Sequence, residues 1–541
     1  MTDILEKINR KLYGVSDKTY EIGFLILIGV SMIQFLLFRY APSLDGPQHL
    51  HNAYVLKDLI FGKGLIRDFY DINQIPVGYW ASHMLLSLFT VFFPPWLAET
   101  LFLLIYVAGV SLAYRYFVTS LIMEYNPIAQ YLIFPFIPSF FLLAGFYAFS
   151  FGVLVLLLVY GYWNRVSHSF GWSSAIKLSL LLLLLYFTHG LVFVFFLASF
   201  IIHFLHESLI NLLKEENKED AWKKILLKSL RTIIAFIPVL IALLIYSRSV
   251  VSMQPAVDTK PVYARELIEH LFRIRPLIGF HHEMESVATK PLFIILLLVG
   301  VTVILQYLIR LQEKKITLRD ILLDRSSIYL ILAMLFLVLY MSNPNQFIGG
   351  SMTVRVGFFF FLFLIMWIPF KRIPLPINIL MGLVILFAVI YNQALMPYFY
   401  KPQVNLIKEI QELDDYLEEG ATVITLRETD NWLHLHYGLY AGLNKHLVNL
   451  NNPQCYGPFP QVWDKENASA MFAGEHQINV PGLGKIDPGK HSSRQVDYIL
   501  VFYHDRFMEK EGNSEWKAIL EQDYNLIQLT SGGAAAAYHR K

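Results

Sequence analysis

An acidic residue and two histidines stand within seven positions of the stretch YAPSLDGPQHLHNAYVLKDL, residues 40–59. Asp45 precedes Gly46-Pro47, and His49 and His51 follow. A fixed carboxylate or imidazole can act as a general base by taking the proton from a weak hydroxyl nucleophile within hydrogen-bonding reach. We therefore take Asp45 and His49 as candidate catalytic residues, with His51 in a supporting role.

The same residues allow two other interpretations, a turn and a metal site. In the first, Asp45-Gly46-Pro47 forms a turn and Asp45 caps a helix that begins near Pro47. In the second, Asp45, His49 and His51 hold a divalent metal ion, because borderline cations accept carboxylate and imidazole ligands together. No second acidic residue adjoins Asp45, which weakens the case for magnesium or manganese. The sequence leaves a metal possible and indicates no other cofactor.

Three arginines on two other segments are candidates for binding a phosphate. Arg355 begins the aromatic-rich run VRVGFFFFLFLIMW, and its planar fork of donors suits a phosphate held at a membrane surface. Arg273 and Arg275 flank a segment whose apolar residues recur at helical spacing, which predicts an amphipathic helix lying on the membrane surface. Contact with lipid headgroups is the alternative role of these arginines.

Three more polar residues are candidates for supporting the same site. His83 lies in the apolar segment PVGYWASHMLLSLFTVFFPPW, residues 76–96, and His189 lies at a Thr-His-Gly break in a longer apolar run. Glu283 follows the arginine-rich segment closely. A hydrogen-bonded structural role is the alternative for both histidines, since buried polar groups are normally satisfied by such bonds.

Membrane helices must position these residues. Of the 541 residues, 55% are hydrophobic and 15% aromatic, and the mean hydropathy is +0.48, well above the range of soluble proteins. Apolar runs close to the roughly 20 residues needed to cross a bilayer recur from Ile22 to Leu395 and then stop. We expect an α-helical polytopic membrane protein of about 11 to 12 transmembrane helices over residues 1–400, followed by a small extramembrane α/β domain, residues 401–541.

The distribution of basic residues predicts the orientation of the chain. The predicted spans are 22–40, 98–118, 127–144, 146–163, 175–190, 191–206, 230–247, 291–309, 326–342, 356–370 and 376–396. If segment 76–96 is re-entrant or lies on the surface, most Lys and Arg residues fall in cytoplasmic loops, as the positive-inside rule requires. The N-terminus is then cytoplasmic. The first outer loop, 41–97, the second, 248–290, and the C-terminal domain lie outside.

Net charge and cysteine content argue against nucleic acid as a partner and against an intramolecular disulfide bond. The net charge of +2 indicates no general attraction to nucleic acid. A single cysteine, Cys455, excludes an intramolecular disulfide. Membrane lipids are the partners that the apolar composition predicts.

Five motifs, taken with this layout, resemble the GT-C superfamily of integral-membrane glycosyltransferases, which includes protein O-mannosyltransferases and aminoarabinose transferases. The motifs are DGPQHLHNA from Asp45, NQIPVGYWASHMLL, FYAFSFGVLVLLLVYGYW, the YFTHGLV break, and the run that Arg355 begins. The shared layout is a cytoplasmic N-terminus, an acidic residue soon after the first span, about a dozen helices and an outer C-terminal domain. The resemblance implies a polyprenyl-phosphate sugar donor and an acceptor hydroxyl on a glycan, lipid or protein.

The resemblance also implies roles for particular residues. The acid of the first loop, here Asp45, acts as a base or organises the acceptor, and a late arginine, here Arg355, meets the lipid-linked phosphate. Arg273 and Arg275 are further candidates for that phosphate. Many members carry two adjacent acids where this chain has Asp45-Gly46, so the resemblance leaves open a metal, and whether His49 or Glu283 completes the site. A bacterial inner membrane with a periplasmic C-terminal domain fits the chain, and an endoplasmic reticulum membrane with the corresponding orientation is the alternative location.

A transporter or flippase for a lipid-linked saccharide is the alternative function. Many transporters contain two related halves and carry their ionisable residues near the middle of the membrane. This sequence shows no related halves, and its candidate residues gather at the outer face. The pattern therefore favours an enzyme, without distinguishing transfer of one sugar from ligation of a preassembled glycan.

Overall fold

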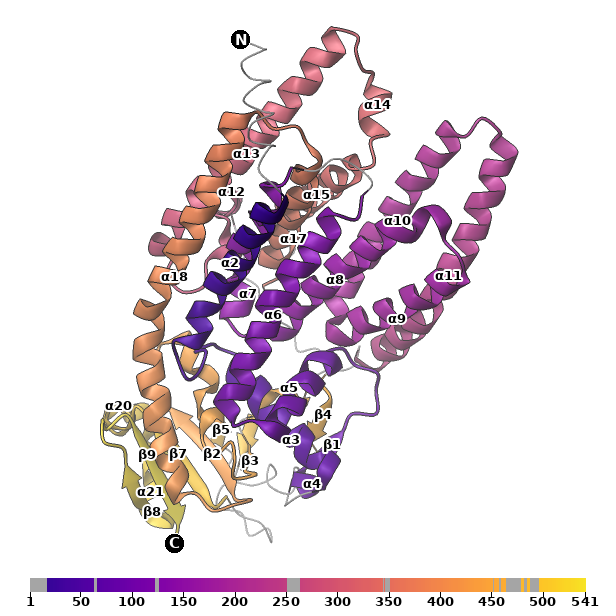
Figure 1. The fold of residues 1–541 in the computed structure, drawn as a ribbon. Helices are drawn as coiled ribbons and strands as arrows, with labels where there is room; N and C mark the ends of the chain where they lie inside the picture. The colour runs from indigo at the N-terminus through magenta and orange to yellow at the C-terminus, as the bar shows by residue number, and fades with distance from the viewer. Residues whose placement is uncertain are drawn as a thin grey trace.

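The computed structural model describes residues 17–62, 66–121, 126–250, 263–343, 345, 351–450, 452–456, 459–463, 478–480, 484–486 and 496–541. Residues 1–16 and part of the predicted outer loop 248–290 lie outside these ranges. A bundle of helices forms the larger part of the molecule, and the strands of the C-terminal region gather at one end of it (Figure 1).

Eight helices in the described part of the chain are long and apolar enough to cross a membrane. They are α2 (Asp17–Leu36), α6 (Pro95–Val118), α8 (Tyr147–Val166), α10 (Gly190–Lys214), α11 (Lys218–Val250), α13 (His282–Gln312), α17 (Met352–Trp367) and α18 (Leu375–Glu412). This finding agrees with a polytopic membrane protein, although eight is fewer than the 11 to 12 spans that the sequence predicts.

Shorter apolar helices account for the difference in number. They are α5 (Trp80–Phe92), the segment made of η1 (Ala129–Phe136) and α7 (Phe140–Leu143), α9 (Trp172–Thr188) and α15 (Ser327–Met341). The longest of them, α9, has 17 residues. Each is therefore shorter than the roughly 20 residues that a perpendicular span requires.

The predicted break at residues 188–190 is present. Helix α9 ends at Thr188, α10 begins at Gly190, and His189 between them has an extended backbone. The imidazole of His189 accepts a hydrogen bond from the N–H of Val192, and so satisfies one of the free donors at the start of α10.

Helix α18 crosses the domain boundary expected at residue 400 and continues to Glu412. Two prolines, Pro397 and Pro402, lie within it. Its later residues change from a membrane composition to an amphipathic one, and Val404, Ile407 and Ile410 are buried. The helix thus connects the bundle directly to the C-terminal region.

A five-stranded mixed sheet forms the core of the C-terminal region. Its order is β3 (Val448–Asn449), β2 (Thr422–Arg427), β7 (Tyr498–Phe502), β9 (Ala535–Arg540) and β8 (Tyr524–Leu529). Strand β2 is parallel to β3 and β7, whereas β9 is antiparallel to both β7 and β8. The C-terminal alanines are therefore buried in an inner strand, where their small side chains fit. Helices α20 (His504–Glu509) and α21 (Ser514–Asp523) complete this α/β unit.

The first outer loop folds against this C-terminal unit. The loop contains α3 (Gly46–Phe61), α4 (Ile66–Phe69), β1 (Tyr70–Ile72) and α5. Strand β1 pairs antiparallel with β4 (Gln461–Trp463), and the rings of Tyr70 and Trp463 stack with centroids 4.4 Å apart. On α3, Asp58 Oδ2 lies 2.5 Å from His446 Nδ1. Two segments from opposite ends of the chain therefore form one unit at this end of the bundle (Figure 1).

The remaining short elements connect these parts. They are η2 (Ser167–Ser169), α12 (Ala264–Phe272), η3 (Arg275–Leu277), α14 (Leu318–Leu322), η4 (Ile368–Phe370), η5 (Leu413–Tyr416), η6 (Trp432–Tyr440), η7 (Pro453–Tyr456), β5 (Ile478–Val480), β6 (Gly484–Ile486) and η8 (Glu511–Asn513). Helix α12 lies where the sequence predicts an amphipathic helix, with Leu267 buried and Ile268 exposed.

Candidate functional site

Asp45 occupies the N-cap position of α3, but its carboxylate makes no capping hydrogen bond. Ser43 Oγ instead accepts the hydrogen bond of the Gly46 N–H, at 3.1 Å. Pro47 stands in the first turn, where its missing N–H costs nothing. The side chain of Ser43, and not that of Asp45, therefore accepts a hydrogen bond at the start of α3. The carboxylate of Asp45 is available for another role.

The backbone at Asp45 is held against the start of α8. The Asp45 N–H donates to the Ala144 carbonyl at 3.0 Å. Gly145 has a left-handed backbone, with φ of +85°, and a Cβ placed there would lie 2.4 Å from the Gly46 nitrogen. Only glycine fits this approach, which sets the position of the carboxylate relative to α8.

We expect Gly145→Ala to destabilise the protein by at least about 2 kcal/mol. A left-handed backbone alone costs an ordinary residue roughly 1–2 kcal/mol, and here the new methyl group meets backbone atoms that cannot rotate away. Thermal unfolding in detergent measures the effect. Gly300→Ala is the matched control, because a Cβ at that position of α13 meets nothing within 4 Å. Equal unfolding temperatures of the two variants would contradict the proposed constraint.

Arg355 brings a half-buried cation close to Asp45. It lies in the first turn of α17, and its guanidinium carbon is 5.7 Å from the ring centre of Phe146 and 5.8 Å from that of Phe149. Its Nε is buried and has no hydrogen-bond partner among the described residues. The charges of Arg355 and Asp45 act on each other, yet the two groups are not in ion-pair contact. A half-buried guanidinium whose buried Nε lacks a partner among the described residues suits an anion.

A histidine of the C-terminal unit faces Asp45 from the other side. His436 Nε2, on η6, lies 3.7 Å from Asp45 Oδ1, and the two side chains keep 14% and 21% of their surface exposed. Burial raises the pKa of Asp45 to about 7, against the opposing effect of the Arg355 charge. Burial, together with the charge of Arg427, lowers the pKa of His436 to about 3. At neutral pH the imidazole is therefore uncharged, and the carboxyl group of Asp45 is near the midpoint of its titration.

His49 and His83 form a hydrogen-bonded pair beside Asp45. His83 Nδ1 lies 2.9 Å from the Tyr79 carbonyl, and His83 Nε2 lies 3.3 Å from His49 Nδ1. Because a carbonyl only accepts, His83 carries its proton on Nδ1, and His49 donates to His83. The ring of His49 also stacks on Tyr147, with centroids 5.5 Å apart. The Nδ1 proton of His49 is thus directed toward His83 and not toward Asp45. This arrangement suits a role for His49 in positioning the site.

His51 and His49 do not share a face of α3, because residues two positions apart point in different directions on a helix. His51 Nε2 is buried and has no hydrogen-bond partner in the described part of the chain, and burial lowers the pKa of His51 to about 4. Within the described ranges, no three His, Cys, Asp or Glu side chains come together in a group that could hold a metal ion. The geometry therefore does not assemble the metal site that the spacing of Asp45, His49 and His51 allows.

His189 caps α10 and also lines the site. Its ring lies edge-on to Tyr79 and to Phe149, with centroids 5.1 and 5.4 Å away. Phe149 is one of the two rings that the Arg355 guanidinium contacts. His189, at the break between α9 and α10, therefore packs against a ring that contacts Arg355.

Arg273, Arg275 and Glu283 form a separate group. Arg273 makes ion pairs with Glu283 at 2.6 Å and Glu269 at 2.8 Å. Arg275 donates to the Ile278 carbonyl, and its guanidinium lies 4.9 Å from the Phe140 ring centre. No contact between described residues joins this group to Asp45, so the arginines are engaged within their own segment.

Several residues of the site have no clear signal in the sequence. Tyr79 adopts a left-handed backbone with φ of 68°, and its ring stacks on Phe459 with centroids 4.7 Å apart. Such a backbone is strained in a non-glycine residue and is found at functional sites more often than elsewhere. Glu99, which is 1% exposed, accepts hydrogen bonds from Tyr147 and the Ala41 N–H. A buried acid inside an apolar span was the one available signal, since such residues are rare in membrane helices.

The site therefore combines a carboxylate with a pKa near neutrality, a guanidinium whose Nε has no partner in the described part of the chain, and surrounding histidines and aromatic rings. It is built from the first outer loop, four helices of the bundle and the C-terminal unit. No protein-family model matches the chain, and no curated protein is significantly similar to it.

Proposed function

We propose that this chain is an integral-membrane glycosyltransferase of GT-C type, which moves a sugar from a polyprenyl-phosphate carrier to an acceptor hydroxyl. One observation carries the proposal most directly: the half-buried Arg355, whose Nε is unpartnered among the described residues, lies close enough for its charge to act on Asp45, a base with a pKa of about 7. A phosphate leaving group requires such a cation, and a hydroxyl nucleophile requires such a base.

The reaction is a single displacement at the sugar carbon. The acceptor oxygen forms the new bond to the anomeric carbon as the bond from that carbon to the phosphate oxygen breaks. The phosphate leaves with the electron pair, and Asp45 takes the acceptor proton. Inversion at the anomeric carbon follows from attack opposite the leaving group. Because negative charge grows on the leaving phosphate, Arg355 stabilises the transition state more than the bound donor.

The arrangement of helices supports an outward-facing site. In this proposal the short helices α9 and α15 and the η1–α7 segment also cross the membrane, which with the eight longer helices gives eleven spans. An odd number places the start of the bundle and the C-terminal unit on opposite sides. Basic residues gather near the ends of α10, α13 and α17 remote from the C-terminal sheet, as the positive-inside rule requires of the cytoplasmic side. A bacterial inner membrane with the site facing the periplasm fits this orientation.

The C-terminal unit contributes to the acceptor side of the site in this proposal. His436 and Phe459 come from that unit, and they contact Asp45 and Tyr79 of the first outer loop. The aromatic face of Phe459 and the neutral imidazole suit a sugar or another polar acceptor. The acceptor remains a glycan, a lipid or a protein hydroxyl.

The test is release of polyprenyl phosphate from a radiolabelled pool of lipid-linked sugars by the purified full-length protein in detergent. A crude membrane extract is included to supply the acceptor. We expect free polyprenyl phosphate to accumulate in step with the labelled product. Movement of intact lipid-linked sugar across proteoliposomes, without any release, would contradict the proposal and identify a transporter. Repeating the assay with a chelator decides whether a divalent metal takes part.

His436→Ala should lower the pH at which the transfer rate is half-maximal. The His436 ring helps to bury Asp45, and burial is the main cause of its raised pKa, so admitting water should move that pKa toward its ordinary value. The pH–rate profile measures this shift. His504→Ala is the control, because His504 contacts Tyr538 on the sheet, away from Asp45. If the midpoint stays in place for both variants, His436 has no role in positioning Asp45.

A further inference from the structure

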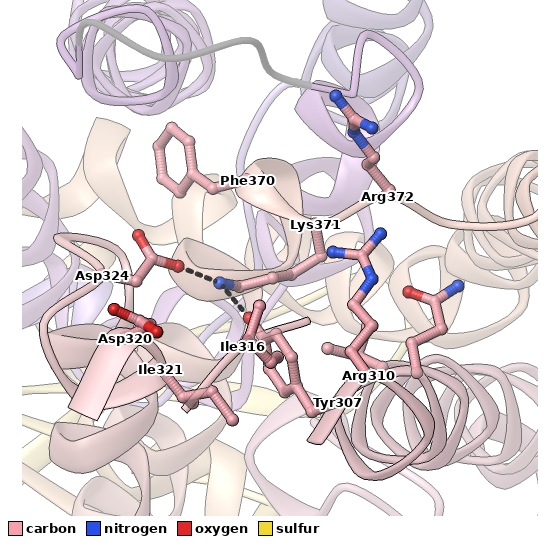
Figure 2. A pocket seen from close by; sticks show the side chains of 11 residues that line it. Tyr307, Arg310, Ile316, Asp320, Ile321, Asp324, Phe370, Lys371 and Arg372 are labelled. Atoms are coloured by element: carbon pink, nitrogen blue, oxygen red, sulfur yellow. Dashed lines mark hydrogen bonds and ion pairs between the residues drawn. The ribbon is translucent and has the colours of Figure 1, made fainter. Parts of the chain in front are cut away.

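A second recess lies at the opposite end of the bundle from Asp45, between α13, α14 and the turn that joins α17 to α18 (Figure 2). Its volume is about 230 Å³. A neighbouring recess of about 460 Å³ continues along the end of α13. Gln306, Arg310 and Ile316 line both, so Arg310 stands where the two recesses meet.

Most charged groups of the two recesses are already engaged. Lys371 Nζ lies 2.7 Å from Asp324 Oδ2 and also donates to Tyr307 and Ser326. Asp320 forms a capping box with Thr317 at the start of α14. Lys315 pairs with Glu313 at 2.9 Å. The acidic side chains are thus bound to groups of the protein and are not free to neutralise Arg310.

Arg310 itself makes no side-chain hydrogen bond or ion pair with the residues that the structure describes. Figure 2 shows Arg310 and Arg372 on one side of the recess, and Asp320 and Asp324 on the other. The guanidinium fork of Arg310 and the Tyr307 hydroxyl line the same space. The guanidinium of Arg310, unpartnered among the described residues, suits the oxygens of a phosphate, and Arg372 lines the same recess.

We propose that this recess binds an anionic phosphate group, at a site separate from the proposed catalytic centre. The surface of α13 beside it favours a lipid as the carrier of that phosphate. Leu305, Leu308 and Ile309 are more than half exposed along this helix, which is long and apolar enough to span a membrane. Acyl chains would pack on these residues while the headgroup enters between Arg310 and Arg372. Basic pockets between transmembrane helices on the cytoplasmic side bind anionic headgroups by the same physics.

The experiment titrates the detergent-purified full-length protein with dioleoyl-phosphatidylglycerol and counts bound lipids by native mass spectrometry. Dioleoyl-phosphatidylcholine, which has no net charge, is the comparison lipid. We expect Arg310→Gln to weaken binding of phosphatidylglycerol about fivefold, the factor that corresponds to about 1 kcal/mol for one basic side chain near a membrane surface. Arg319→Gln is the matched control, since Arg319 lies on α14 but does not line either recess.

A second variant separates loss of charge from loss of the recess. Ile316→Trp fills the space that both recesses share and keeps every charge, so it should weaken phosphatidylglycerol binding as well. Competition by inorganic phosphate at millimolar concentration would assign the site to free phosphate, and its failure to compete would assign it to the lipid. Undiminished binding by Arg310→Gln, or an equal loss in Arg319→Gln, would overturn the proposal. Thermal unfolding of each variant confirms that it is folded.

Discussion

Asp45→Asn should reduce the rate of sugar transfer by at least about 10²-fold while the protein stays folded. An amide has the shape of the carboxylate but cannot accept the acceptor proton, and general base catalysis contributes typically 10²–10⁴-fold. Release of polyprenyl phosphate measures the effect. The wild-type rate should rise with pH through about 7, because only the ionised carboxylate is active and burial raises its pKa to about 7.

The matched control for this variant lies on the same helix. Asp58 is a buried acid of α3 that contacts His446 of the C-terminal unit. Asp58→Asn should lower the unfolding temperature through this junction and leave the pH dependence of transfer unchanged. Asp45→Asn should instead reduce the rate of transfer and change its pH dependence, without lowering the unfolding temperature. If both variants lose activity only in proportion to the protein unfolded, Asp45 is structural and its role as a base is wrong.

The same pKa predicts how Asp45 affects stability. Between its ordinary value of 3.8 and about 7, Asp45 is protonated in the folded state and ionised in the unfolded state. The folded state therefore binds more protons, and its stability falls as the pH rises through this window. Asp45→Asn removes that loss, so the variant should unfold at a higher temperature than the wild type at pH 8 and at a similar one at pH 4.

Arg355→Gln should lower turnover about 10²- to 10³-fold, the range seen when one donor to a developing oxyanion is removed. The loss should appear in the turnover number as well as in the apparent affinity for the donor, because charge on the phosphate grows during bond cleavage. Stability should not fall, since the change removes a half-buried cation whose buried Nε has no hydrogen-bond partner within the described ranges.

Arg165→Gln is the control for Arg355. Arg165 lies near the last turn of α8, where it contacts Tyr116 and Thr119, remote from the start of that helix at Tyr147. Its replacement should leave turnover unchanged. Arg355→Lys should recover only part of the activity, because an ammonium group keeps the charge but not the planar fork. Normal turnover by Arg355→Gln would remove Arg355 from the site.

The sequence predicts the bundle, the C-terminal unit and the break at His189, because each depends on local composition or on one polar residue in an apolar run. It predicts 11 to 12 spans where eight long apolar helices are described, since apolar runs such as α9 and α15 form helices shorter than a standard span. The sequence also selects Asp45 and Arg355, as charged residues next to apolar runs. It cannot place them together, because their proximity depends on the packing of α3 against the start of α8.

Other features of the site depend on contacts between distant segments. His436 and Phe459 reach Asp45 and Tyr79 only because the first outer loop folds onto the C-terminal unit. Local charge alone makes Arg273 a candidate for binding a phosphate. Its ion pairs with Glu269 and Glu283 depend on the way the chain turns back after α12. Single-sequence patterns report composition and periodicity, and neither contains these pairings.

The pairing of β1 with β4 has a consequence for biosynthesis. Strand β1 leaves the ribosome early, but its partner, Gln461–Trp463, is made only after every helix of the bundle. Asp45 and Tyr79 therefore lack their contacts with His436 and Phe459 until the last segment has been made. Under the proposed function, the nascent chain does not transfer sugar from its lipid donor during insertion. Activity begins only when synthesis is almost complete.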